Sequence, residues 1–181
     1  MAAVKDFRPE TKFVLEHWDD VQLLVEALDA ASTDVSGLLE AVQKSLPERS
    51  WFDEESWDVE ADGKKGFYTW KKDGWGTGDE VFYLGVFEVS PEAIMSEDPT
   101  AWVYVLAPTK LRTDGVRERI RKAAEKGGLQ GKSTSKYPFY RTFSFDGVRT
   151  EPAKIRDLIL NELDGIAKIL IPVIDAIASG K

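Results

Sequence analysis

Apolar residues in the first quarter of the chain recur every three or four positions, which is typical of amphipathic helices. One such stripe, which Thr11 can cap, consists of Val14, His17/Trp18, Val21, Leu24/Val25 and Leu28. A second stripe, which Ser32 or Thr33 can cap and Pro47 ends, consists of Val35, Leu38/Leu39, Val42 and Leu46. The short link between them predicts an antiparallel helical hairpin over residues 1–48.

From Trp51 the period of the pattern changes to two. Trp57, Val59 and Ala61 alternate with charged residues, and a second alternating run covers Phe67 to Lys72. The intervening segment, Asp62 to Gly66, reads DGKKG and has the composition of a turn. These features predict a β-hairpin.

Two later runs, Val81 to Val89 and Ala101 to Ala107, are apolar at almost every position and rich in valine and aromatic residues. This pattern is typical of central strands in a sheet that is covered on both faces. A loop with one helical turn is expected between them. Phe139 to Phe145 alternates again and predicts a fifth strand.

Two further helices are predicted in the second half of the chain. Thr113 can cap the first, which extends to Lys126 and ends at two glycines. Thr150 can cap the second, with Pro152 in its first turn and Pro172 expected to kink or split it. The fold class is therefore α+β: an N-terminal helical hairpin, a mainly antiparallel sheet of about five strands, and a long C-terminal helix packed on the sheet.

Composition agrees with one domain over residues 1–181, in which the hairpin (1–48) is followed by the sheet and two further helices (51–181). With 181 residues and 43% apolar content, the chain can bury one substantial core. It has no cysteine and one histidine, which excludes disulfides, thiolate chemistry and multi-histidine metal sites. Its first residues lack the apolar run of a secretory signal and no apolar run is long enough to cross a bilayer, so we expect a cytoplasmic protein with no membrane partner.

Three alternate glycines, Gly74, Gly76 and Gly78, precede the third apolar run. A phosphate-binding loop needs a strand before its glycines and a helix after them, whereas here a strand follows. Asp79 and Glu80 would also repel phosphate. The glycines therefore predict a turn between strands.

Charge is distributed unevenly along the chain. The net charge is −8, yet residues 1–60 hold 15 acidic and 5 basic residues, whereas residues 110–141 hold 3 acidic and 10 basic ones. The overall acidity disfavours a surface that is devoted to nucleic acid or anionic lipid, although a local basic face is compatible with it. An ordinary solvated surface is the simplest explanation of both segments.

The order of FYLGVFE (82–88), AWVYVLA (101–107), a basic helix, YPFYRTFSF (137–145) and ILIPVIDAI (169–177) resembles the non-catalytic C-terminal region of uncharacterised bacterial and phage proteins classed with the PD-(D/E)XK nucleases. The resemblance covers residues 57–178. The nuclease signature requires carboxylates and a lysine around Mg²⁺. The one triplet of that kind considered, Asp62-Gly63-Lys64, falls in the predicted hairpin turn, so the resemblance implies no nuclease site.

Other catalytic patterns are also lacking. His17 lies beside Trp18 on a predicted buried edge, where a structural histidine is the simpler interpretation. No Gly-x-Ser-x-Gly elbow is present. The acidic residues between Asp53 and Glu60 do not have the spacing of a calcium loop. We expect no metal site, no cofactor and no enzymatic activity.

Two hypotheses of function follow. The first is a non-catalytic protein-interaction domain, such as an inhibitor, immunity or adaptor protein, which covers the basic surface of a protein partner with an acidic face rich in tryptophan: Trp51, Trp57, Trp70 and Trp75. The alternative is an accessory nucleic-acid-binding domain that uses the basic segment 110–141: Arg112, Arg117, Arg119, Arg121, Lys122, Lys126, Lys132, Lys136 and Arg141.

Overall fold

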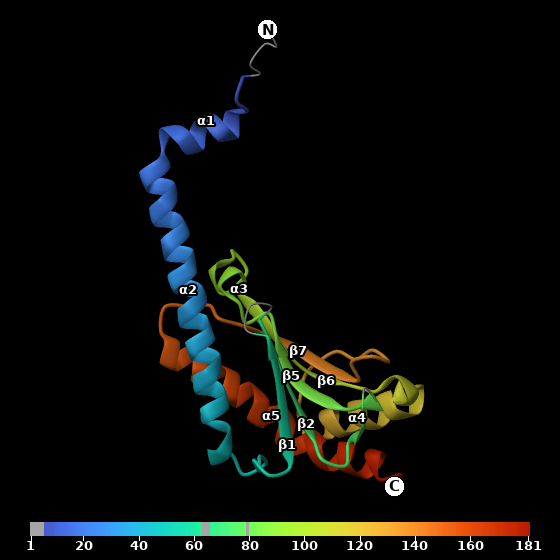
Figure 1. The fold of residues 1–181 in the computed structure, drawn as a ribbon. Coiled ribbons are helices and arrows are strands. Elements are labelled where there is room, and N and C mark those ends of the chain that lie inside the picture. Colours follow the sequence, from blue (N-terminus) through green and yellow to red (C-terminus); the bar gives the residue numbers. More distant parts are fainter. Residues whose placement is uncertain (1–5, 63–65, 79) are drawn as a thin grey trace.

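The protein has an α+β fold in a computed structural model that describes residues 6–62, 66–78 and 80–181 (Figure 1). Its helices are α1 (Pro9–Glu16), α2 (Trp18–Lys44), α3 (Pro91–Met95), α4 (Asp114–Lys126) and α5 (Pro152–Ala178), with 3₁₀ turns at Leu46–Glu48 and Thr109–Leu111. Its strands are β1 (Trp57–Asp62), β2 (Phe67–Lys72), β3 (Gly76–Thr77), β4 (Glu80–Val81), β5 (Tyr83–Phe87), β6 (Thr100–Leu106) and β7 (Phe139–Ser144). The predicted fold class is confirmed.

The main sheet has the strand order β1-β2-β5-β6-β7, and every neighbouring pair is antiparallel. Val86 on the central strand pairs with Tyr68 on one side and Val103 on the other, and all three side chains are buried. Gly85, the residue before Val86, pairs with Thr69 and Tyr104, and these residues belong to the opposite face. The register thus divides the sheet into two faces of different composition.

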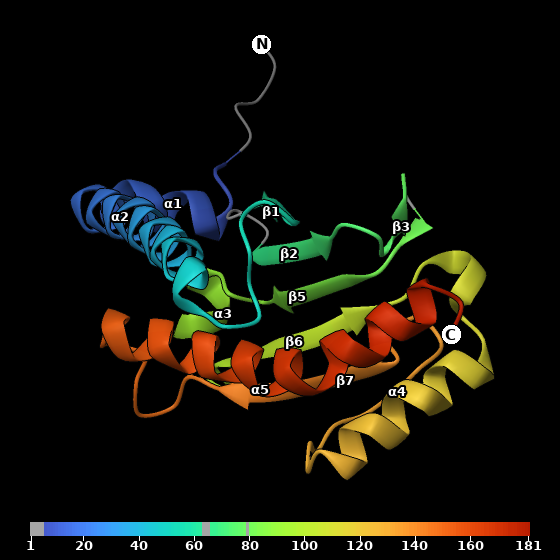
Figure 2. The same ribbon diagram turned by 90° about the horizontal axis from the view of Figure 1, so that it is seen from below.

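Helix α5 lies across one face of the sheet, and both α2 and α4 pack against it (Figure 2). Ten residues of α5 are buried, at the three- and four-residue spacing that lines one side of a helix: Ile155, Ile159, Leu160, Leu163, Ile166, Ala167, Leu170, Ile171, Ile174 and Ile177. They belong to the same core cluster as Val86 and Val103. The molecule therefore has two layers, one of sheet and one of helices.

The predicted helical hairpin over residues 1–48 is wrong, because α2 continues without a break from Trp18 to Lys44. The expected turn contains no glycine or proline between Glu26 and Ser36. The Thr33 hydroxyl, which was predicted to cap a new helix, donates instead to the Asp29 carbonyl within the same helix. The chain bends earlier, at His17, so that a long helix stands away from the body (Figure 1).

Two other predicted helix features need correction. Helix α5 has Glu151, not Thr150, at its N-cap position, and no side chain caps it. Of the two effects expected of Pro172, a kink or a split, the split is ruled out, because α5 runs unbroken from Pro152 to Ala178. The Pro172 ring cannot donate to the Lys168 carbonyl, but both residues lie on the exposed side of the helix, where water can satisfy that oxygen. Buried Ile171 and Ile174 hold the helix against the core on either side of the proline.

Several local predictions are confirmed. β1 and β2 form an antiparallel hairpin, although Gly63 and Lys64 of its turn lie outside the described residues. The Thr113 hydroxyl accepts a hydrogen bond from the Val116 amide and so caps α4. The glycines at 74, 76 and 78 have positive φ angles and lead into the small β3–β4 pair, which confirms a turn between strands.

Two aspartates of α5 tie the segments around β1 and β2 to the helical layer. Asp164 accepts hydrogen bonds from Arg49 Nη1 at 3.0 Å and from Trp51 Nε1 at 2.7 Å. Asp175, three helical turns further on, accepts from Lys72 Nζ at 2.9 Å and from Trp75 Nε1 at 2.7 Å. Each carboxylate therefore pairs one cation and one indole N–H.

We expect Asp164→Ala and Asp175→Ala each to lower the free energy of unfolding by about 1–3 kcal/mol, because each leaves a partly buried cation and an indole donor without their acceptor. Asp157→Ala, an exposed aspartate on the same helix, is the matched control and should change it by less than about 0.5 kcal/mol. Urea denaturation measures all three. Equal effects of the three substitutions would contradict the assigned role.

Candidate functional site

The face of the sheet opposite α5 is apolar, and no helix covers it in the described part of the chain. Alternate residues of β5 and β6 point to this face, and the register places Tyr83 opposite Leu106 and Phe87 opposite Trp102. A hollow of about 560 Å³ opens there. Its lining residues are Glu60, Phe67, Thr69, Tyr83, Phe87, Trp102, Tyr104, Leu106 and Tyr137. We call this surface the open sheet face.

Gly85 shapes the floor of the hollow. The ring of Tyr104 from the neighbouring strand lies over it so closely that a Cβ atom at position 85 would come within 2.6 Å of Tyr104 Cζ. The phenol is 7% exposed, and this burial raises its pKa above the ordinary value. Tyr104 therefore forms a flat, uncharged floor below the more exposed aromatic rings around it.

A second hollow, of about 510 Å³, adjoins the first across Trp102. Trp102 stacks on Tyr140 with ring centroids 5.3 Å apart, and Tyr137 makes an edge contact with Tyr104. The backbone of Lys132 pairs with that of Tyr140, so the polar loop after α4 runs along the outer edge of β7. The aromatic surface thus extends across three strands and this loop.

Charges lie on opposite sides of the first hollow. Glu60 enters from β1, and Lys136 Nζ lies 5.0 Å from the ring centroid of Tyr137 on the other side. Lys71, next to the hollow on β2, pairs with Asp58 at 3.4 Å. The apolar centre therefore has one acidic and one basic border.

The four predicted partner-binding tryptophans do not form a surface. Trp57, Trp70 and Trp75 are buried in the core, and Trp51 is half-buried with its indole N–H bound to Asp164. The rings of Trp51 and Trp75 both contact Trp57, at centroid distances of 5.6 and 5.1 Å. This hot-spot prediction is wrong, because these tryptophans fill the space between the sheet and α5.

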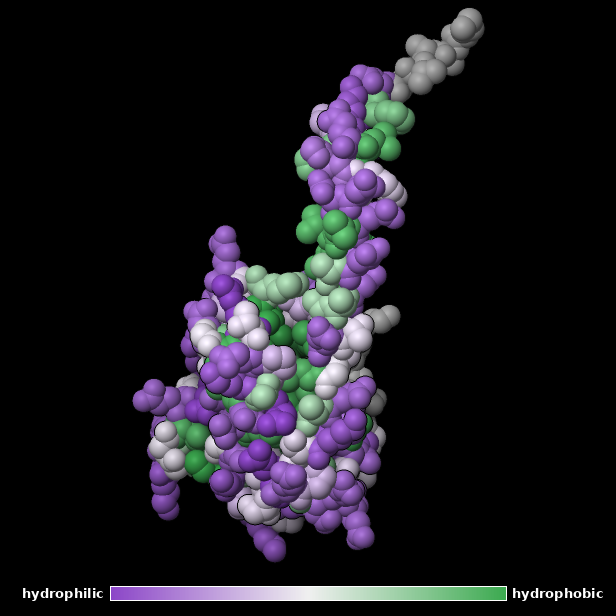
Figure 3. Space-filling model, turned by 90° about the vertical axis from the view of Figure 1, so that its left-hand side faces the viewer, coloured by the Kyte–Doolittle hydropathy of each residue, from purple (hydrophilic) through white to green (hydrophobic). Residues whose placement is uncertain are grey.

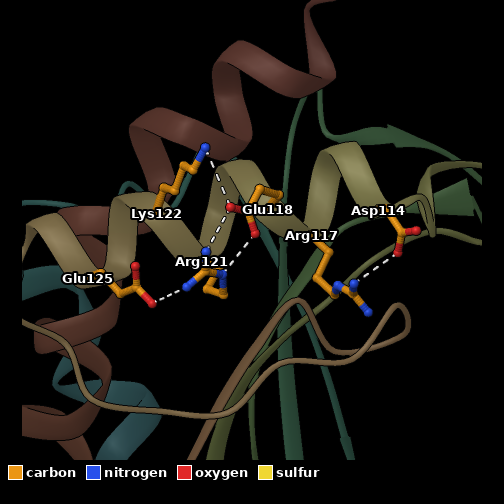
Figure 4. Close-up of polar contacts among 6 residues, drawn as sticks. All are labelled: Asp114, Arg117, Glu118, Arg121, Lys122 and Glu125. Carbon is orange, nitrogen blue, oxygen red and sulfur yellow. Dashed lines mark hydrogen bonds and ion pairs between the residues drawn. The ribbon is translucent and has the colours of Figure 1, made fainter.

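The predicted basic residues are dispersed, and carboxylates neutralise most of those on α4. Figure 4 shows Arg117 paired with Asp114, and Arg121 and Lys122 paired with Glu118. Arg121 also pairs with Glu125. These i,i+3 and i,i+4 pairs make the exposed side of α4 a surface of mixed charge. A bare basic helix, which phosphate binding requires, is not formed there.

The remaining basic residues of the segment lie in other places. Arg112 donates to the Ala107 carbonyl and Arg119 to the Lys181 carbonyl. Arg141 points to the helical side of the sheet and pairs with Glu162 of α5. Lys126 is exposed at the end of α4. Lys132 and part of Arg141 line the second hollow, and Lys136 lies against Tyr137 at the border of the first.

The sequence did contain a signal for the open sheet face. β5 and β6 are apolar on both sides, which predicted cover on both faces, whereas the structure covers one face only. The overlooked residues are the aromatic members of the uncovered side: Phe67, Tyr83, Phe87, Trp102, Tyr104, Tyr137 and Tyr140.

Comparison with protein-family models, curated proteins and solved structures gives no match, so the nuclease resemblance stays an expectation from the sequence.

Neither a cluster of metal ligands nor a membrane-spanning helix is found in the described residues. Among the described residues no three histidine, aspartate or glutamate side chains converge as metal ligands, and the acidic residues around Asp53 to Glu60 form no such group. None of the helices in that part of the chain is long and apolar enough to cross a membrane. The open sheet face is therefore the candidate site that the structure offers.

Replacing Gly85 should disturb the floor of the hollow. We expect Gly85→Ala to displace the Tyr104 ring and to lower the free energy of unfolding by about 1–3 kcal/mol, because the packed ring must move away from the new methyl group. In a chain that already carries Tyr104→Ala, the same Gly85→Ala substitution should lower the free energy of unfolding by less, because the ring is no longer there. Urea denaturation of the native chain, the two single variants and the double variant measures this difference. Simple additivity of the two changes would contradict the contact.

The charge pairs of α4 predict an unusual titration. Hydrogen bonds from Arg121 lower the pKa of Glu118 from 4.5 to about 2. Because the folded-state pKa is lowered, the pair stabilises the protein above pH 4.5, and this contribution is lost as the pH falls toward 2. Carboxyl NMR should show the low midpoint in the native chain and a return toward 4.5 in Arg121→Gln. An unchanged midpoint would contradict the pairing.

Proposed function

We propose that this protein is a protein-interaction domain that binds a segment of a partner protein on the open sheet face. The uncovered apolar side of β5 and β6, with its aromatic hollow, is the observation that carries the proposal. Concave apolar sites that are lined by aromatic side chains and a few polar groups are the usual places where proteins bind ligands. Aromatic side chains are also the residues that most often provide the energy of an interface.

The dimensions of the hollow favour one apolar anchor from the partner. A space of about 560 Å³ with a flat tyrosine floor accommodates a leucine, methionine or phenylalanine side chain with its neighbours. Glu60 on one border would attract a basic residue beside that anchor. The proposed partner is therefore still basic, as expected from the sequence. Its basic residue would be attracted by Glu60, however, and not by a surface rich in tryptophan.

Peptide selection tests the proposal directly. Peptides enriched from a displayed random library against the full chain should contain an apolar anchor next to Lys or Arg. We expect Phe87→Glu to weaken their binding at least about tenfold, since it places a charge in the apolar face. Glu60→Lys should weaken the binding of peptides that contain Lys or Arg more than the binding of peptides that lack them. Isothermal titration calorimetry gives the dissociation constants.

Met95→Glu provides the matched control, because Met95 is an exposed apolar residue on α3, away from the hollow. It should leave the peptide affinities within about twofold of the native chain. Selected peptides that bind Phe87→Glu as well as the native protein, or a selection that yields no binding peptide, would contradict the proposal.

An accessory nucleic-acid role is a second candidate because the stacked Trp102–Tyr140 pair lies close to two lysines. Single strands bind to surfaces that combine aromatic stacking with positive charge. Fluorescence anisotropy with a labelled single-stranded oligonucleotide separates the two functions. Affinity that falls steeply between 50 and 200 mM salt and is lost in Lys132→Ala/Lys136→Ala would support this candidate. Undetectable binding at 50 mM salt would exclude it.

A further inference from the structure

The upper part of α2, together with α1, forms an arm that extends beyond the body, and its apolar side is uncovered. Figure 3 shows hydrophobic side chains along this arm among hydrophilic ones. Trp18, Leu24, Val25 and Leu28 are each more than half exposed. Such a row of large apolar side chains on a soluble helix needs a partner.

The uncovered row continues a stripe that is buried lower on the same helix. Trp18, Val21, Val25 and Leu28 alternate at spacings of three and four residues, and the same alternation reaches Val35, Leu39 and Val42. Leu39 and Val42 are buried where α2 packs against α5. One side of one helix is thus covered at its base and bare at its tip.

The distribution of charge on the arm indicates what covers it. Residues 9–34 contain seven acidic residues and one lysine, which at first sight suggests a basic partner. The residues that flank the stripe on α2 are, however, mostly uncharged: they are Gln22, Leu24, Asp29 and Ala31, of which only Asp29 carries a charge. Asp19 and Glu26 point away from the stripe, so two such arms can meet with little repulsion between like charges.

We propose that the arm pairs with the arm of a second copy of this chain, and that the two helices run antiparallel. A parallel partner would have to continue down the stripe into the space that α5 occupies at its base. An antiparallel partner avoids this collision because its own body lies at the opposite end. Apolar layers form if Trp18 meets Leu28 of the partner and Val21 meets Val25 of the partner.

The seam of the proposed dimer is confined to α2, because the chain bends at His17 and α1 does not continue along the stripe. This inference does not depend on the function of the open sheet face.

Sedimentation equilibrium of the full chain tests the association. We expect the native protein to be a dimer at micromolar concentration, and Val25→Glu/Leu28→Glu to raise the dissociation constant at least about 100-fold, because it places charges in the apolar seam. The matched control, Ala30→Glu/Thr33→Glu, adds the same charges on the polar side and should remain dimeric. A native chain that is monomeric at 100 μM, or a dimer that survives the seam variant, would overturn the proposal.

Introduced cysteines test the orientation, since the chain has none of its own. Trp18→Cys and Leu28→Cys chains should form a disulfide-linked dimer under mild oxidation only when they are mixed. In a parallel pair each variant would link to itself. Self-linking of both variants, or no linking in the mixture, would overturn the antiparallel arrangement. Circular dichroism confirms that each variant retains its helix content.

Discussion

The burial of the apolar side of α5 against one face of the sheet is the interaction on which the rest of the structure depends. Its isoleucines and leucines contribute much of the core, and both α2 and α4 take their positions by packing against it. The aspartates of α5 also fix the segments on either side of the β1–β2 hairpin, through Trp51 and Trp75. Helical and β layers are therefore organised around one element.

A single helical layer leaves the second face of the sheet to solvent. On that face the chain places tyrosine and tryptophan on the central strands, which combine an apolar ring with a polar atom that tolerates water. Gly85 lets the Tyr104 ring lie against the sheet, so the surface is hollow at its centre. The same absence of a second layer thus produces both the apolar exposure and the concave shape.

Local pattern predicted the element types well because it reports the immediate neighbours of each residue. The strands, α4 with its Thr113 cap and the turn at Gly74–Gly78 all follow from such signals. The number of layers over β5 and β6 did not follow, because an apolar strand face looks the same in sequence whether a helix or a binding partner covers it. The tryptophans near Trp57 were misassigned for a related reason, since composition does not distinguish core from interface.

The helical hairpin was mispredicted because Ser32 and Thr33 resemble caps, whereas no glycine or proline enforces a turn there. The consequence is that one helix, α2, is packed against α5 at its C-terminal end and exposed to solvent at its N-terminal end. Most of the stability of a helix in a protein comes from the packing of its apolar side, so the unpacked arm depends on the packed base of the same helix. Protection of the backbone amides from hydrogen exchange should then decrease gradually from Val42 toward Trp18 along one uninterrupted helix. A partner that covers the tip would raise the protection of amides that lie far from the body.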